Sequence, residues 1–193
     1  MKNNLIVAGV PRAGKSTLSR LLARTYGYQH VSMDSIIAGI EACFPETGIS
    51  THADLPPADR LRLISGRMAP FIRAMLDSGE YDEFSPGMVL DVYQLLPEDF
   101  AKHIRGANCA VVYLITPDVT PEERFAILKR YDTEKDYTFG RPDGKLRKDA
   151  EILVEQSLLM RDQCRRLGIP FAATARDREE VLRRLLRTLP FSI

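Results

Sequence analysis

Residues 9–17 read GVPRAGKST and match the pattern G-x-x-x-x-G-K-[ST] at every fixed position. The apolar run 5–10 leads into this stretch, and apolar residues spaced three or four apart follow it as far as Tyr26. This order predicts a short strand, a glycine-rich turn and an amphipathic helix, the context in which the pattern binds phosphate. A turn made for packing alone would leave Lys15 and Ser16 unexplained.

The chemistry of phosphate binding accounts for the residue types in this stretch. Glycines let the backbone point its N–H groups at an anion where a Cβ would obstruct it. The helix beginning at Lys15 offers free N–H groups and the positive end of its dipole. We expect the Lys15 ammonium to reach the β and γ phosphates and the Ser16 hydroxyl to bind Mg²⁺. The expected nucleotide-binding residues of this stretch are Gly9, Pro11, Arg12, Ala13, Gly14, Lys15, Ser16 and Thr17.

The rest of the chain continues the alternation of strands and helices. Further strands are expected at residues 29–33, 87–92, 109–116 and 171–174. Helices are expected at 35–40, 58–78, 97–104, 121–131, 146–167 and 181–189. The polar stretch 132–144 has no period and is expected to be a mobile loop. Five short strands separated by helices predict a parallel sheet with helices on both faces.

Composition excludes several classes of protein. The chain has 193 residues, 45% of them apolar and 27% charged, with a net charge of +1, which suits one ordinary domain rather than a disordered or nucleic-acid-coating chain. The longest apolar run, 109–115, falls far short of the roughly 18 residues that span a bilayer. The start of the chain lacks a signal-peptide cleavage pattern, so we expect a cytoplasmic protein. Cys43, Cys109 and Cys164 are widely spaced and are expected to be packing residues.

Other motifs narrow the class of nucleotide-binding protein. A GTPase switch would carry D-x-x-G and N-K-x-D motifs, and the sequence contains neither. Motor and remodelling ATPases have longer domains and a module that faces their partner, for which 193 residues leave little room. A small kinase fits this length.

The motif and the order of elements resemble those of the P-loop small-molecule kinases, a group that includes nucleoside monophosphate kinases, shikimate and gluconate kinases, and chloramphenicol phosphotransferase. The resemblance implies an α/β, three-layer P-loop NTPase fold with a five-stranded parallel sheet. It also implies that residues 1–193 form a single kinase domain, with a helical acceptor-binding insertion at 35–86 and a lid region at 124–148.

The resemblance points to Asp34 as the catalytic base. In these kinases the second strand often ends in an aspartate beside the acceptor hydroxyl, and here VSMDS (31–35) places Asp34 at the expected strand end. Open α/β sheets also bind their ligands in a crevice at the carboxyl ends of the strands. The alternative is that Asp34 only caps the following helix. No arginine lies between 29 and 59 to hold an acceptor phosphate, which argues against a nucleotide acceptor.

Asp91 is the second carboxylate of interest. It follows the apolar residues 88–90, where a magnesium-binding aspartate of this group would lie, and Ser16 would be its companion ligand. The alternative is a strand-end aspartate bonded to a neighbouring turn.

The lid region 124–148 contains eight basic and four acidic residues. In the resembling kinases, lid arginines close over ATP and neutralise the transferring oxygens. By position, Arg124 is expected near the adenine or its phosphates, and Arg130 and Arg141 at the transferring group. Arg176 follows the last strand, together with Thr174 and Arg178, where these families place an adenine-contacting loop. A solvated helix face is the alternative, and nucleic-acid binding is disfavoured because the excess charge is modest.

These inferences combine into one functional hypothesis. We expect an enzyme that uses ATP and Mg²⁺ to phosphorylate a hydroxyl of a small molecule, with Lys15, Asp34, Arg130 and Arg141 as catalytic residues. One alternative is a nucleoside or nucleoside monophosphate kinase of the adenylate kinase type. Another is a regulatory protein that binds ATP without transferring phosphate. No membrane partner is expected, and the sequence leaves the acceptor and the oligomeric state open.

Overall fold

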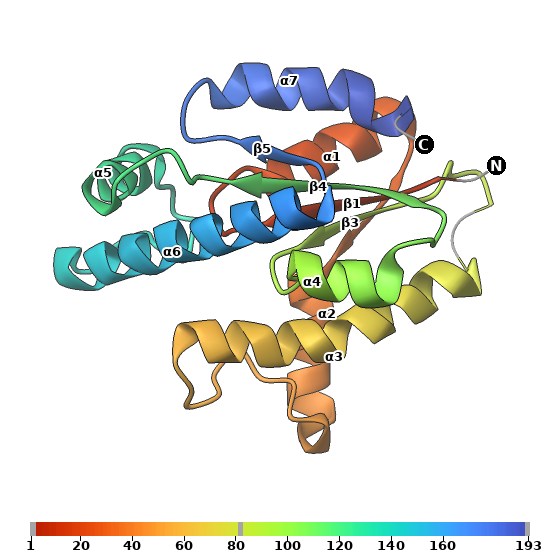
Figure 1. The fold of residues 1–193 in the computed structure, drawn as a ribbon, viewed down its shortest axis with the longest axis horizontal. Coiled ribbons are helices and arrows are strands. Elements are labelled where there is room, and N and C mark those ends of the chain that lie inside the picture. Colours follow the sequence, from red (N-terminus) through yellow and green to blue (C-terminus); the bar gives the residue numbers. More distant parts are fainter. Residues whose placement is uncertain (1–2, 81–82, 192–193) are drawn as a thin grey trace.

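The computed structural model describes residues 3–80 and 83–191, and these contain five strands in one all-parallel sheet (Figure 1). The strands are β1 (Asn4–Gly9), β2 (Gln29–Ser32), β3 (Met88–Val92), β4 (Cys109–Ile115) and β5 (Phe171–Ala173). Their order across the sheet is β2-β3-β1-β4-β5, so β1 is central and pairs with β3 and β4. The predicted α/β class and parallel sheet are confirmed.

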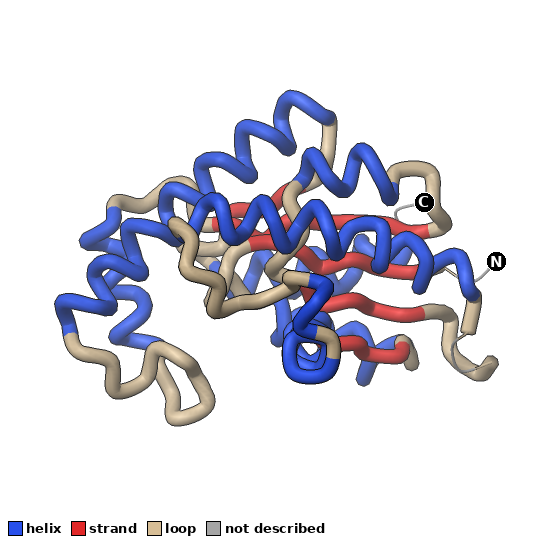
Figure 2. Tube along the Cα trace, turned by 90° about the horizontal axis from the view of Figure 1, so that it is seen from below, coloured by secondary structure: helices blue, strands red, loops and turns tan. Residues whose placement is uncertain are grey.

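Helices cover both faces of this sheet, which is why its central strands are buried (Figures 1 and 2). On one face lie α1 (Lys15–Tyr26) and α7 (Arg178–Thr188), followed by the short η3 (Leu189–Phe191). On the other lie α3 (Pro57–Ser78), α4 (Pro97–Asp99), the π-helical turn η2 (Phe100–Ile104) and α6 (Asp143–Leu167). Every residue of β1 is buried, as expected for a strand covered on both sides. No helix among the described residues is both long and apolar enough to cross a bilayer.

Two segments extend from this layered body. In the first, α2 (Met33–Cys43) projects from one side of the sheet and leads through η1 (Pro45–Thr47) back to α3 (Figure 1). The Glu41 carboxylate accepts hydrogen bonds from Ser50 Oγ at 2.5 Å and from Thr51 N at 3.2 Å, which folds the connecting loop against α2. In the second, α5 (Pro121–Tyr131) packs against α6, and the loop 132–142 joins them.

The structure differs from the sequence-based expectation at three helix starts, one of which is α7, where the helix begins at Arg178 rather than at residue 181. Helix α2 begins at Met33 with Ser32 as its N-cap, so Asp34 belongs to the helix rather than to the end of β2. Helix α6 begins at Asp143 rather than near Leu146, which shortens the polar loop. Helices α6 and α7 begin three residues before the first apolar residue of their stripes, so hydrophobic spacing alone places these starts too late. Helix α2 begins with the buried Met33, which the expected strand 29–33 had included.

The expectation that all three cysteines are packing residues is wrong for Cys43, which is exposed at the end of α2. Cys164 is buried and Cys109 partly so, and burial raises the pKa of Cys109 to about 11 and that of Cys164 to about 12.

We therefore expect one fast-reacting thiol when the folded protein is treated with 5,5′-dithiobis(2-nitrobenzoate) at pH 8. Only the thiolate reacts, and burial keeps Cys109 and Cys164 almost wholly protonated at that pH. Cys43→Ser should remove the fast phase, and all three thiols should react in urea. Two or more fast thiols in the native protein would contradict this assignment.

Candidate functional site

The phosphate loop of residues 10–14 connects β1 to α1 and is pinned to the neighbouring strand. Gly9 has φ +124°, and a Cβ built on it would lie 2.0 Å from the carbonyl oxygen of Leu114 in β4. Val10 N donates to that same oxygen at 3.1 Å. The chain therefore needs glycine at position 9 for its close approach to β4, a reason that the sequence pattern alone does not show.

The start of α1 meets the requirements of an anion site. Its N-cap is Gly14, with φ +103°, and within this fully described helix no side chain caps the first turn and no acidic residue lies there. The first N–H groups and the positive end of the helix dipole therefore stay available to an anion. The predicted phosphate-binding geometry fits these residues.

Lys15 is buried beneath this loop, with only 7% of its surface exposed. Its Nζ donates to Val10 O at 3.1 Å and lies 5.9 Å from the ring centroid of Tyr93. Burial lowers the pKa of Lys15, and the carboxylates of Asp91 and Asp34 oppose that shift. The structure thus brings both aspartates singled out in the sequence within electrostatic reach of the same ammonium.

Asp34 reaches this place from the first turn of α2. Its side chain is exposed, and Ser32 occupies the N-cap position, so the alternative reading of Asp34 as the helix cap is wrong. The negative charge still suits the first turn of a helix. Asp34 therefore combines an exposed carboxylate with proximity to Lys15, the combination that a base acting on a bound hydroxyl requires.

Asp91 reaches the site from within β3, one residue before its end. It is buried, pairs in register with Val7 of β1 and Ser32 of β2, and its Oδ2 lies 3.9 Å from His30 Nε2. The alternative of a strand-end aspartate bonded to a turn does not match this position inside the sheet.

The hard oxygen donors Ser16 and Asp91 suit Mg²⁺ rather than a soft metal. The described residues contain no group of three or more acidic, histidine or cysteine side chains that could cage a metal. Mg²⁺ commonly takes only one or two protein ligands and completes its shell with phosphate and water. The binding of magnesium by Ser16 and Asp91 remains a prediction.

Arg124 lies beneath the phosphate loop rather than at its surface. It is only 1% exposed, and its Nη2 donates to Pro11 O at 2.9 Å. Burial lowers the pKa of Arg124 to about 10, with Arg12 and Arg178 adding to the decrease. A guanidinium buried in this way against the loop carbonyl supports the loop and adds positive potential to it.

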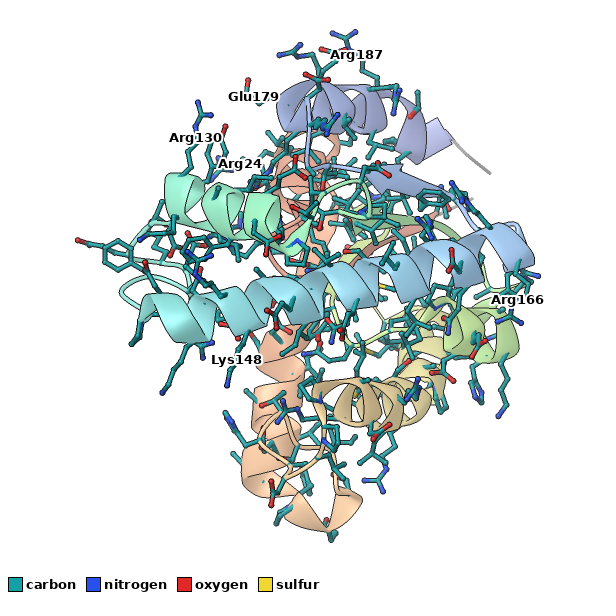
Figure 3. The ribbon with its side chains drawn as sticks, turned by 60° about the vertical axis from the view of Figure 1, so that its left-hand side comes forward. Arg24, Arg130, Lys148, Arg166, Glu179 and Arg187 are labelled. Atoms are coloured by element: carbon teal, nitrogen blue, oxygen red, sulfur yellow. The ribbon has the colours of Figure 1, made fainter. Side chains whose placement is uncertain are left out.

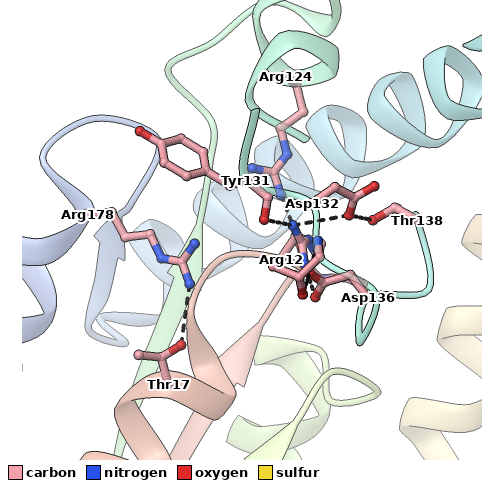
Figure 4. Close-up of polar contacts among 10 residues, drawn as sticks. Arg12, Thr17, Arg124, Tyr131, Asp132, Asp136, Thr138 and Arg178 are labelled. Atoms are coloured by element: carbon pink, nitrogen blue, oxygen red, sulfur yellow. Dashed lines mark hydrogen bonds and ion pairs between the residues drawn. The ribbon is translucent and has the colours of Figure 1, made fainter. Parts of the chain in front are cut away.

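Arg178, rather than Arg176, contacts the nucleotide-binding elements. Its Nη2 lies 3.4 Å from Thr17 Oγ1, and its Nε would be 3.1 Å from a Cβ on Gly14 (Figure 4). Arg176, two residues earlier, is exposed. Arg178 is the first residue of α7, and the start of this helix turns its side chain toward α1. The sequence showed only that both arginines follow β5, so it could not tell which of them contacts α1.

The Arg12 side chain points away from the phosphate loop and toward the loop 132–142, which we call the lid loop (Figure 4). Its Nη2 donates to Tyr131 O at 2.8 Å and lies 3.3 Å from Asp132 Oδ1, and its Nη1 pairs with Asp136. The lid loop is therefore joined directly to the phosphate loop.

Arg130 and Arg141 are held by other partners. Arg130 is exposed, lies 5.3 Å from the Tyr131 ring centroid, and points away from the body in Figure 3. Arg141 pairs with Asp149 and lies 5.4 Å from the Tyr137 ring centroid. The role of both arginines at the transferring group stays a prediction.

Sequence reasoning missed two tyrosines that are electrostatically coupled to charged residues of the site. Tyr93 follows β3, and its hydroxyl donates to Gln156 Oε1 at 2.9 Å. Burial raises the pKa of Tyr93; the charge of Asp34 adds to this increase, and the charge of Arg60 opposes it. Partial desolvation also raises the pKa of Tyr137, although 52% of its surface is exposed. In the sequence, only the position of Tyr93 just beyond the end of a strand could have indicated that it belongs to the site. For Tyr137, the only such indication was its place in the lid region.

Comparison with known proteins identifies the fold. No protein-family model matches the chain, and no curated protein matches it in sequence. Among solved structures, a shikimate kinase from Bacteroides thetaiotaomicron is 18% identical with a TM-score of 0.52, and the match covers 98% of this chain and 99% of that one. A sugar kinase from Janibacter sp. HTCC2649 is 16% identical with a TM-score of 0.56, covering 100% and 96%.

A gluconokinase from Sinorhizobium meliloti 1021 is 17% identical with a TM-score of 0.52, and the match covers 98% of this chain and 92% of that one. These matches span nearly the whole of each chain, so they describe the fold of the entire domain. The chain has the fold of the P-loop small-molecule kinases, as its motif and its order of elements predicted.

Proposed function

We propose that the protein is a kinase that uses ATP and Mg²⁺ to phosphorylate a hydroxyl group of a small molecule. The placement of Asp34 carries the proposal. From outside the phosphate loop, its carboxylate favours the charged form of Lys15 and raises the pKa of Tyr93, so it lies close to both groups. A protein that only senses ATP needs no such carboxylate. The fold shared with shikimate, sugar and glucono kinases supports the same class.

The proposed reaction uses the site as follows. The acceptor hydroxyl oxygen bonds to the γ-phosphorus, the bond from that phosphorus to the β–γ bridging oxygen breaks, and ADP leaves. The hydroxyl proton passes to the Asp34 carboxylate. Lys15, Arg124 and Arg178 stabilise the phosphate charge from the loop side. Ser16 and Asp91 would hold Mg²⁺, which when bound neutralises the phosphates. Arg130 and Arg141 would contact the transferring group after leaving their present partners.

Replacing Asp34 by asparagine tests the proposal. We expect the variant to lose about a hundredfold in turnover, because the amide cannot accept the proton, whereas the fold should remain. The assay follows Mg²⁺-dependent ADP release with separate pools of nucleosides, nucleoside monophosphates, sugar acids, cyclic hydroxy acids, polyols, and aminocyclitol and phenylpropanoid antibiotics. Glu179→Gln is a matched control, because Glu179 is an exposed first-turn residue of α7 that points outward in Figure 3.

The outcomes separate the candidate functions. Stimulation by one hydroxyl-bearing pool that is lost in Asp34→Asn and kept in Glu179→Gln supports the proposal and names the acceptor class. Stimulation by nucleosides or monophosphates alone would assign a nucleoside or nucleotide kinase. Tight ATP binding without stimulation by any pool would favour an ATP-binding regulatory protein, and full turnover in Asp34→Asn would exclude Asp34 as the base.

A further inference from the structure

Arg12 has a backbone conformation that its side chain does not favour. Its φ is +61°, and within the described residues Asp177 is the only other non-glycine residue with a positive φ. Residues with a Cβ rarely adopt this left-handed conformation, and where they do the surrounding structure holds them there. The contacts of the Arg12 side chain show what that conformation serves.

The guanidinium of Arg12 is bound by three groups of the lid. Tyr131 O accepts at 2.8 Å, Asp132 Oδ1 lies at 3.3 Å, and Asp136 forms the third contact (Figure 4). The Arg12 side chain is only 14% exposed, and those of Asp132 and Asp136 are 10% and 24% exposed. Solvent therefore screens these ion pairs much less than it screens pairs on the protein surface.

The same two carboxylates also organise the lid loop. Asp136 Oδ2 accepts from Thr133 N at 2.9 Å and from Thr133 Oγ1 at 2.7 Å. Asp132 Oδ1 accepts from Thr138 Oγ1 at 2.5 Å. The lid loop is therefore folded around the same two aspartates that bind Arg12. Because of this, the conformation of the lid loop is coupled to its contact with the phosphate loop.

The other cations around the phosphate loop have a different kind of partner. In the described structure Lys15 bonds to Val10 O, Arg124 to Pro11 O and Arg178 to Thr17 Oγ1, all of which are neutral oxygens. These direct partners leave the three positive charges available to an anion, although Asp91 and Asp34 also act on Lys15 at longer range. Arg12 differs from them, because two carboxylates already neutralise its charge.

We propose that Arg12 is a positioning residue that ties the lid loop, residues 132–142, to the phosphate loop, and that its guanidinium does not bind the nucleotide phosphates. The consequence for catalysis rests on the proposed function: the lid held by Arg12 stays over the nucleotide and slows its release. The order of the lid loop itself does not depend on that function.

Three variants test this inference. Arg12→Gly removes the guanidinium and suits the left-handed backbone, so the phosphate loop keeps its path. Asp132→Asn with Asp136→Asn removes the opposing charges without touching the phosphate loop, and a triple variant combines all three changes. Glu134→Gln is the matched control, an exposed acid of the same loop.

Two measurements are made on each variant. Amide hydrogen exchange of residues 133–140 without nucleotide should become about tenfold faster in Arg12→Gly and in the double asparagine variant, the effect of losing a shielded ion pair. The triple variant should be no faster than the double asparagine variant, because removing Arg12 has no further effect once its two carboxylate partners are neutral. Stopped-flow release of the fluorescent analogue mant-ADP should accelerate by a similar factor, and Glu134→Gln should match the wild type in both.

Two results would overturn the inference. One is a pattern of amide hydrogen exchange that does not depend on the contact: exchange in the lid loop is unchanged in Arg12→Gly, or the accelerations of the separate variants multiply in the triple variant. The other is Arg12→Gly weakening mant-ADP binding by the same factor with and without the two aspartates, which would make Arg12 a phosphate ligand. Failure of the proposed function is distinguishable, because the amide hydrogen exchange is measured without nucleotide. It would still show whether Arg12 holds the lid loop in a protein that phosphorylates no acceptor or does not bind mant-ADP.

Discussion

Replacing Lys15 by methionine is expected to reduce phosphoryl transfer roughly a thousandfold, the scale of losing a preorganised charge at the transferring group. The Lys15 ammonium is buried beside the phosphate loop, where electrostatic interactions are stronger than in water. Burial lowers the pKa of Lys15, but Asp91 and Asp34 favour its charged form. Methionine keeps most of the buried side-chain volume, so the loss should arise from the missing charge rather than from a cavity.

The measurement combines single-turnover kinetics at saturating MgATP and acceptor with calorimetry of MgATP binding. Lys148→Met provides the control, because Lys148 is exposed on α6 and points outward in Figure 3. Circular dichroism melting of both variants shows whether the fold is kept. If Lys15→Met binds MgATP as tightly as the wild type and transfers phosphate at the same rate, the assignment of the phosphate cradle fails.

Local features of the fold were predictable because their causes are local. The helix from Lys15 to Tyr26 has the bounds that the motif and the apolar spacing as far as Tyr26 predict. β4 coincides with the longest apolar run in the chain. The parallel arrangement followed from the alternation of strands with helices, and the structure has it.

Contacts within the site were less predictable, because they join distant parts of the chain. Arg12 and Tyr131 are 119 residues apart in sequence, and Arg178 and Thr17 are 161 apart. Sequence reasoning therefore placed Arg12 among the phosphate ligands by its position in the motif, without its lid partners. The start of α2 was missed for another reason: a serine cap at Ser32 and an aspartate cap at Asp34 fit the same apolar spacing.

Position 9 is the place where a small change should damage both stability and binding. Gly9→Ala is expected to lower the free energy of unfolding by about 3 kcal/mol or more, from overpacking together with a left-handed backbone. The added Cβ would lie 2.0 Å from Leu114 O, which is backbone of a central strand and cannot move aside as a side chain could. Urea unfolding followed by circular dichroism measures the loss.

The same substitution in α3 separates this steric effect from the general effect of exchanging glycine for alanine. Gly66 is exposed inside that helix, and a Cβ there would meet nothing within 4 Å, so Gly66→Ala should stabilise the protein by up to about 1 kcal/mol. Gly9→Ala should also weaken MgATP binding, because any shift that relieves the clash moves Val10, whose N–H bonds to Leu114 and whose carbonyl holds Lys15. Unchanged unfolding in Gly9→Ala would mean that β1 and β4 are not held as closely as the hydrogen bond from Val10 requires.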